Sequence, residues 1–263
     1  MNNIGFKIVD KDEDIVIEIL QAAERENAPV EVGLYGESQR VREFCRTLKI
    51  PKNIHFNHIV YSLTDIEKHP KIFLDEVKIA KSIGADYGIH HMAKYPMTAQ
   101  KGYQKELIKD VTNKMLVVEK SALKAKFDVY IENTFESISF YRKVFLNLKK
   151  SGTKRLNFCF DIGHAKVWSG DDFNSWIEFL LELKELGFKI HFHLHVNRGL
   201  VDEHLSMLEA DERNIRGDDG VFSHITYKEM FYKIQDLFPQ ERKIFEVKPH
   251  LAIENRKQII KIL

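Results

Sequence analysis

Residues 155–196 read RLNFCFDIGHAKVWSGDDFNSWIEFLLELKELGFKIHFHLHV, and this stretch decides the fold. It opens with a β-rich run, continues with a segment whose apolar residues recur at three- and four-residue spacing, and closes with a second β-rich run. Gly187 separates the periodic segment from the second run, where a helix C-cap is expected. Short connections between a strand, a helix and a strand predict parallel strands with a right-handed crossover.

The same alternation recurs along the whole chain. We expect eight strands, at IGFKIV (4–9), PVEVGL (29–34), NIHFNHIV (53–60), ADYGIHH (85–91), FDVYIE (127–132), RLNFCFD (155–161), FKIHFHLHV (188–196) and RKIFEV (242–247). Periodic segments such as 14–27, 70–85 and 171–187 predict the helices between them, with Gly84 as a further C-cap. Because no GxGxxG turn follows the first strand, the pattern favours a closed barrel over an open dinucleotide-binding sheet. We therefore predict a single-domain (β/α)8 TIM barrel over residues 1–263.

Composition and charge exclude several classes of protein. Apolar residues make up 44% of the chain and charged residues 30%, which supplies a full core and excludes a disordered chain. The formal net charge of +1 is too balanced to indicate a nucleic-acid or membrane surface by itself. Two cysteines, Cys45 and Cys159, are too few for a disulfide framework. With no signal-peptide pattern and no apolar run near the roughly 20 residues of a membrane span, we expect a cytoplasmic protein.

Histidines and carboxylates stand where the predicted strands end. In a (β/α)8 barrel the chemistry lies at the C-terminal ends of the strands. Six consecutive strands deliver such residues there, and the following loops add more: His58, His90, Glu132, Asp161, His164, His195, Asp202, His204 and Glu246. Burying so many imidazoles and carboxylates unpaired is costly, and a divalent metal ion is the simplest compensation. A set of nitrogen and oxygen ligands without thiolate predicts Zn²⁺ or Mn²⁺.

Strand parity ranks the remaining histidines. Alternate residues of a strand share a face, so His191 and His193 point into the barrel if His195 does, and we expect them one layer beneath the ligands. In the fourth strand we expect His90 to point inward and His91 outward. His55 is expected to face outward or to lie behind the ligands.

The order and spacing of these residues resemble a known family. The segments FDIGHA (160–165), ENT (132–134), HVN (195–197) with a downstream DEH (202–204), and the late Glu246 resemble the xylose-isomerase-like TIM barrel superfamily. That superfamily includes endonuclease IV and many sugar isomerases and epimerases. The resemblance extends from His58 to Glu246, nearly the whole chain.

The isomerase and epimerase branch implies one metal ion. Its ligands would be Glu132, Asp161, His195 and Glu246. Glu132 and Glu246 would also act as the catalytic acid–base pair on a carbon next to a carbonyl group. The substrate would be a small sugar or sugar phosphate.

The endonuclease IV branch implies up to three Zn²⁺ ions and hydrolysis of phosphodiesters, with abasic DNA as a candidate partner. It uses the same four ligands and five more, which match His58, His90, His164, Asp202 and His204. Tyr61 falls where that family keeps a tyrosine that contacts DNA. The complete set of nine makes phosphodiester hydrolysis our leading hypothesis, with the isomerase as the alternative and a non-catalytic ligand-binding barrel as a third.

One segment departs from the endonuclease IV pattern, and two further features of the loops are candidates for function. The text after the Asp202–His204 pair is LSMLEADERN, where endonuclease IV has Gly-Glu-Gly. Trp168 and Arg198 are further candidates for substrate binding, since both follow strand ends in loops. The polar segment 198–226 is the longest predicted connection, and a loop of that length in a compact barrel is usually functional.

Overall fold

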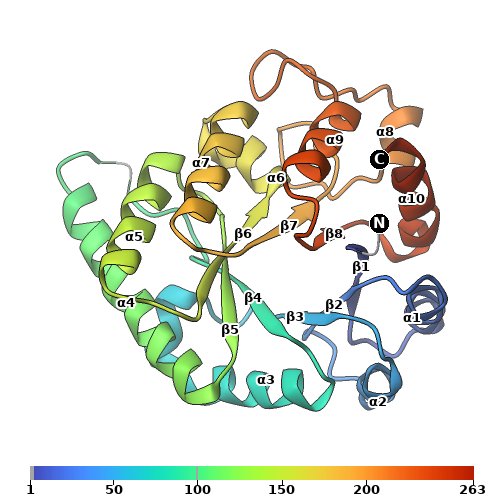
Figure 1. The fold of residues 1–263 in the computed structure, drawn as a ribbon, viewed down its shortest axis with the longest axis horizontal. Helices are drawn as coiled ribbons and strands as arrows, with labels where there is room; N and C mark the ends of the chain where they lie inside the picture. Colours follow the sequence, from blue (N-terminus) through green and yellow to red (C-terminus); the bar gives the residue numbers. More distant parts are fainter. Residues whose placement is uncertain (1–2, 99) are drawn as a thin grey trace.

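The computed structural model describes residues 3–98 and 100–263, and within them eight parallel strands close into a barrel (Figure 1). The strands are β1 (Ile4–Val9), β2 (Val30–Gly33), β3 (Lys52–His55), β4 (Tyr87–His91), β5 (Asp128–Glu132), β6 (Leu156–Asp161), β7 (Ile190–Leu194) and β8 (Lys243–Phe245). Each strand pairs with the next one in chain order, and β1 pairs with β8. The predicted barrel is confirmed.

Helices surround the barrel as an outer layer (Figure 1). The α-helices are α1 (Asp14–Glu26), α2 (Gln39–Thr47), α3 (Pro70–Ser82), α4 (Gln104–Ala125), α5 (Ile138–Lys150), α6 (Ile162–His164), α7 (Phe173–Glu185), α8 (Met207–Glu212), α9 (Tyr227–Leu237) and α10 (Pro249–Ile262). A 3-10 helix, η1 (Leu63–Lys68), and a π-helical turn, η2 (Ala165–Ser169), complete them. In the part of the chain described, no helix is long and apolar enough to cross a bilayer.

The last helix closes the outer layer against the first. Figure 1 shows α10, in red, beside α1, in blue. The Arg256 guanidinium of α10 donates a hydrogen bond to the Ile4 carbonyl at 2.8 Å and forms an ion pair with Glu26. Contacts between the two ends of the chain therefore seal the barrel where β1 meets β8.

Local signals explain where elements begin and end. Gly84 and Gly187 follow helices with φ of 74° and 89°, as their predicted C-cap role requires. β3 ends at His55, five residues before the predicted end, because Asn57 forms a turn: its side-chain oxygen accepts a hydrogen bond from the Ile59 N–H at 3.2 Å. The segment 198–226 is less irregular than predicted, since Ser206 begins α8 with a capping box.

The main apolar core lies between strands and helices rather than inside the barrel. Outward residues of β6 such as Phe158 and Phe160 pack against Trp176, and all three are fully buried. Inside the barrel the buried apolar cluster is small, with Ile89, Tyr130 and Cys159 as its members. The rest of the interior described below is polar. The region along the barrel axis is therefore available for the charged side chains that are described in the next section.

Replacing Phe158 by Ala tests this account of the core. The ring lies 5.3 Å from Phe145 and 5.6 Å from Phe179 between centroids, so Phe158→Ala leaves a cavity in the outer layer. We expect the free energy of unfolding, measured by urea titration, to fall by about 3–5 kcal/mol. Tyr232→Ala, at a residue 57% exposed, serves as the control and changes it by less than about 0.5 kcal/mol. A loss below about 1 kcal/mol for Phe158→Ala would contradict this placement of the core.

Candidate metal centre

Three buried carboxylates converge on one imidazole nitrogen at the top of the barrel. His193 Nδ1 lies 2.9 Å from Glu246 Oε1, 3.1 Å from Glu132 Oε1 and 3.9 Å from Asp161 Oδ2. Glu132 and Asp161 end β5 and β6, and Glu246 directly follows β8, so three strands bring them together. Asp161 Oδ2 has no hydrogen-bond partner in residues 3–98 and 100–263. Such closely packed, buried negative charge calls for a cation.

His195 completes the set of four ligands that both branches of the superfamily share. Its Nε2 lies 3.3 Å from Asp161 Oδ1. The ring fits because residue 163 is glycine: a Cβ atom there would lie 2.0 Å from His195 Cε1. Glu132, Asp161, His195 and Glu246 thus meet at one rim, as the sequence predicted.

A second group of ligand-type side chains surrounds Asp202. His204 Nε2 lies 2.8 Å and His164 Nε2 3.2 Å from Asp202 Oδ2. Burial lowers the pKa of His164, but Asp161 and Asp202 outweigh it and raise that pKa to about 10. Burial also opposes charge on His204, and Asp202 and Glu246 raise its pKa to about 10. The two imidazolium ions therefore supply positive charge that a metal ion could supply instead.

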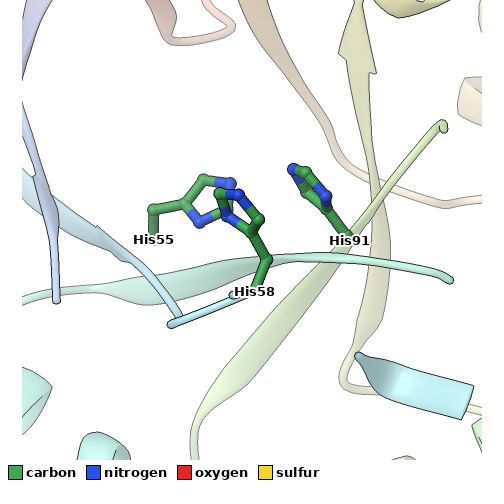
Figure 2. Close-up of side chains that lie close together, drawn as sticks. All are labelled: His55, His58 and His91. Atoms are coloured by element: carbon green, nitrogen blue, oxygen red, sulfur yellow. The ribbon is translucent and has the colours of Figure 1, made fainter. Parts of the chain in front are cut away.

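Three histidines, His55, His58 and His91, form a third group (Figure 2), and the His91 ring lies 5.4 Å from the ring of His164 in the second group. The rings of His58 and His91 stack with centroids 4.0 Å apart, and ligand atoms of His55, His58 and His91 lie within 4.8 Å of one another. Tyr35 Oη lies 2.7 Å from His55 Nδ1 and 2.9 Å from His58 Nδ1. His55 Nε2 and His91 Nε2 lie 2.9 and 3.3 Å from Glu132 Oε2. Glu132 therefore joins this group to the three carboxylates.

Two imidazoles of the third group, those of His58 and His91, have lowered pKa values that favour the neutral form. Burial, with His55 adding repulsion, lowers the pKa of His58 to about 3. Burial likewise lowers the pKa of His91 well below its usual value. A neutral imidazole is the form that binds metal, so these two residues are suited to ligation.

The parity predicted for β4 is wrong. His91 pairs with Glu132 across β4 and β5 and faces the pocket, whereas His90 points outward. The His90 ring packs against Tyr61 and Phe56 at 4.4 and 5.5 Å between centroids, and neither of its nitrogens has a hydrogen-bond partner in the described chain. His90 is therefore no part of the metal centre, and His91 takes the place predicted for it.

Tyr61 and Arg198 also lie away from the pocket. Tyr61 is 1% exposed, and its hydroxyl donates a hydrogen bond to Glu76 Oε2 at 2.6 Å, so the prediction that it contacts substrate is wrong. Arg198 forms an ion pair with Glu203 and does not line the cavity, which corrects its assignment as well. Trp168 is 37% exposed, with its ring 4.9 Å from the ring of His164, and its contact with substrate stays a prediction.

The groups line a cavity of about 330 Å³, and Lys7 reaches into it from β1. The lining includes Lys7, Tyr35, His58, His91, Glu132, His164, Asp202, His204, Glu246 and Lys248. The Lys7 ammonium forms an ion pair with Glu246 and lies 3.5 Å from Glu31 Oε1. The sequence analysis missed Lys7, Tyr35 and the role of His55. Had the sequence predicted that β3 ends at His55, this residue would have been placed at the rim with the other candidates. Nothing in the sequence pattern marked Lys7 or Tyr35 as a residue of the cavity.

Comparison with known proteins places the fold. No family model and no curated protein sequence matches the chain. Among solved structures, the TTHB071 protein from Thermus thermophilus, soaked with ZnCl2, is similar over 99% of this chain and 97% of its own, with 18% identity and a TM-score of 0.69. The chain has the fold of the xylose isomerase-like barrels. A D-tagatose 3-epimerase-like protein is 15% identical, with coverage of 98% and 96% and a TM-score of 0.67. A xylose isomerase domain protein from Planctomyces limnophilus is 13% identical, with coverage of 98% and 95% and a TM-score of 0.58.

Gly163→Ala tests the geometry of this site. The new methyl group would displace the His195 ring, so we expect the affinity for Zn²⁺, measured by calorimetric titration, to fall by about 10–100-fold. Gly102→Ala is the matched control, since no heavy atom lies within 4 Å of its added Cβ, and should bind as the parent does. Equal affinity in both variants would show that His195 takes no part in binding.

Proposed function

We propose that the chain is a divalent-metal-dependent isomerase or epimerase of a small sugar or sugar phosphate. The observation that carries the proposal is the convergence of Glu132, Asp161 and Glu246, with His195 beside them. Oxygen and imidazole donors suit Zn²⁺ or Mn²⁺. The cavity of about 330 Å³ lies at the small end of ligand pockets and suits a single sugar unit. The similarity in fold to a D-tagatose 3-epimerase-like protein agrees with this substrate class.

The proposal gives four residues the role of metal ligands and one of them, Glu246, the additional role of the base. Glu132, Asp161, His195 and Glu246 would hold the ion, which when bound polarises carbonyl and hydroxyl oxygens of the substrate. Burial raises the pKa of Glu246, but His193 and Lys7 outweigh it and keep that pKa well below the usual range. The Glu246 carboxylate is therefore ionised at neutral pH and suited to take a proton from the carbon next to a carbonyl group.

In this proposal Glu132 must carry a proton when the substrate binds; it would deliver that proton to the carbon and be left as carboxylate, while Glu246 keeps the proton it removed. Glu132 is the second member of the acid–base pair, since it faces the same cavity from β5. His193 fixes both members, because its Nδ1 lies within 3.1 Å of one oxygen of each. Both carboxylates are at most 5% exposed, so bulk water is kept from the reacting carbon.

A second candidate function, metal-dependent phosphodiester hydrolysis, is favoured by one observation. The groups around Asp202 and around His55, His58 and His91 exceed what a single ion requires. Several metal ions in one site commonly stabilise the attacking and leaving oxygens of a phosphoryl group. Zn²⁺ would be the cofactor and a phosphodiester, DNA included, the substrate class. The balanced charge of the chain, +1 overall, gives this reading no added support from a basic surface.

Proton exchange in D₂O distinguishes the two functions. With Mn²⁺ or Zn²⁺ present, we expect NMR spectra of ketoses and their phosphates to show deuterium entering at the carbon next to the carbonyl group. Glu246→Gln should slow this exchange by at least about 100-fold, because the variant lacks the base, and a chelator should abolish it. Glu254→Gln, at an exposed glutamate of α10, is the control and should exchange at the parent rate.

The contradicting outcome is equally specific. Metal-loaded protein that exchanges no sugar proton but hydrolyses bis(p-nitrophenyl) phosphate or an abasic-site duplex would replace the proposal with the second candidate. In that case the loss in Glu246→Gln should be matched by losses in His91→Gln and His204→Gln, because these two histidines would hold the additional ions.

A further inference from the structure

A second set of ligand-type side chains lies deeper in the barrel, beneath the metal centre. Glu31 on β2, Cys159 on β6, and His191 and His193 on β7 are all 0% exposed. Barrel interiors are usually filled by branched apolar side chains, so four buried polar groups at this level need a reason. The proposed sugar chemistry uses His193 alone among them, and only through its Nδ1.

The two imidazoles are oriented as metal ligands are. His191 Nδ1 lies 2.8 Å from the Tyr87 hydroxyl, and His193 Nδ1 faces the carboxylates of Glu132 and Glu246. In metal sites the ring nitrogen that does not bind the ion commonly forms a hydrogen bond of this kind. Both rings therefore present Nε2 to the same point, and His191 Nε2 has no hydrogen-bond partner in the described structure.

The spacing of the donor atoms matches a four-coordinate ion. Glu31 Oε2 lies 3.0 Å from His193 Nε2 and 3.5 Å from His191 Nε2. Nitrogen and oxygen ligands at about 2.0–2.1 Å from a tetrahedral zinc ion are separated by about 3.3 Å. The Cys159 sulfur lies within 4.8 Å of a ring nitrogen of His191 and of a ring nitrogen of His193, so the thiol borders the same two imidazoles.

We propose that Glu31, Cys159, His191 and His193 form an interior zinc site, separate from the metal centre above it. Thiolate sulfur, imidazole nitrogen and carboxylate oxygen are each donors that bind Zn²⁺ in proteins. With all four ligands from the protein and no exposed surface, the site is structural, and the ion enters as the strands assemble. The Cys159 thiol proton leaves to solvent when the ion binds, so the sulfur ligates as thiolate.

The glutamate is itself held in place for this role. Asn53 Nδ2 donates a hydrogen bond to Glu31 Oε2 at 2.5 Å, and the Lys7 ammonium lies 3.5 Å from Glu31 Oε1. His193 links the two sites, because its Nε2 faces Glu31 while its Nδ1 faces the catalytic carboxylates. A zinc ion in the interior site would therefore hold the His193 ring, which contacts Glu132 and Glu246 through its Nδ1.

Cobalt substitution tests the proposal, because sulfur is present in this site and absent from the metal centre. The full chain is produced in medium with Co²⁺ as the added transition metal and freed of loosely held ions by gel filtration. We expect a near-ultraviolet thiolate-to-cobalt charge-transfer absorption. Cys159→Ser should lose the absorption and one bound cobalt per chain. Cys45→Ser, which removes the other of the two cysteines, should keep both.

A second variant keeps the test decisive if Cys159→Ser folds poorly by circular dichroism. His191→Gln leaves both thiols in place and should weaken the thiolate-bound cobalt at least about tenfold, which chelator competition measures. Absence of the charge-transfer absorption in the parent protein, or its persistence in Cys159→Ser, would overturn the proposal and leave a hydrogen-bonded thiol. Because sugar exchange is read separately, failure here is distinct from failure of the proposed function.

Discussion

The structure depends on the electrostatic demand of three carboxylates buried around one nitrogen. Glu132, Asp161 and Glu246 bring up to three negative charges within 3.9 Å of His193 Nδ1, in an interior shielded from water. Uncompensated, such an arrangement would cost far more than a domain's net stability. Lys7, His193 and His204 provide compensation from the protein itself. A divalent metal ion could supply the same compensation in their place.

The same demand explains the division of the core. Because the barrel axis is occupied by ionisable groups, apolar packing is concentrated between strands and helices, where Phe158 and Trp176 lie. The interior is instead ordered by separate hydrogen bonds, one between Tyr87 and His191 and another between His193 and Glu31. His193 contacts Glu31 through one ring nitrogen and Glu132 and Glu246 through the other, so residues deeper in the barrel help to orient these two carboxylates. The layer beneath the rim residues is therefore polar as well as buried.

Much of this could be predicted from sequence, and the failures have physical causes. Strand–helix alternation predicted the barrel, and residues at strand ends predicted Asp161 and His195, because parallel strands meet at one rim. Adjacent histidines in β4 could not be ranked without the register, so His90 and His91 were exchanged. The contributions of Lys7, on β1, and Tyr35, just after β2, could not be predicted, since a single lysine or tyrosine has no sequence pattern that separates a pocket residue from a packed or solvated one.

Anomalous diffraction at the zinc absorption edge, from crystals grown with Zn²⁺, tests the central claim most directly. The account predicts a peak bounded by Glu132, Asp161, His195 and Glu246, at about 2.0–2.2 Å from their ligand atoms. Lys7 should then have left the Glu246 carboxylate. A zinc-saturated crystal with no peak at that point, and with Lys7 and His193 still paired to the carboxylates, would contradict it.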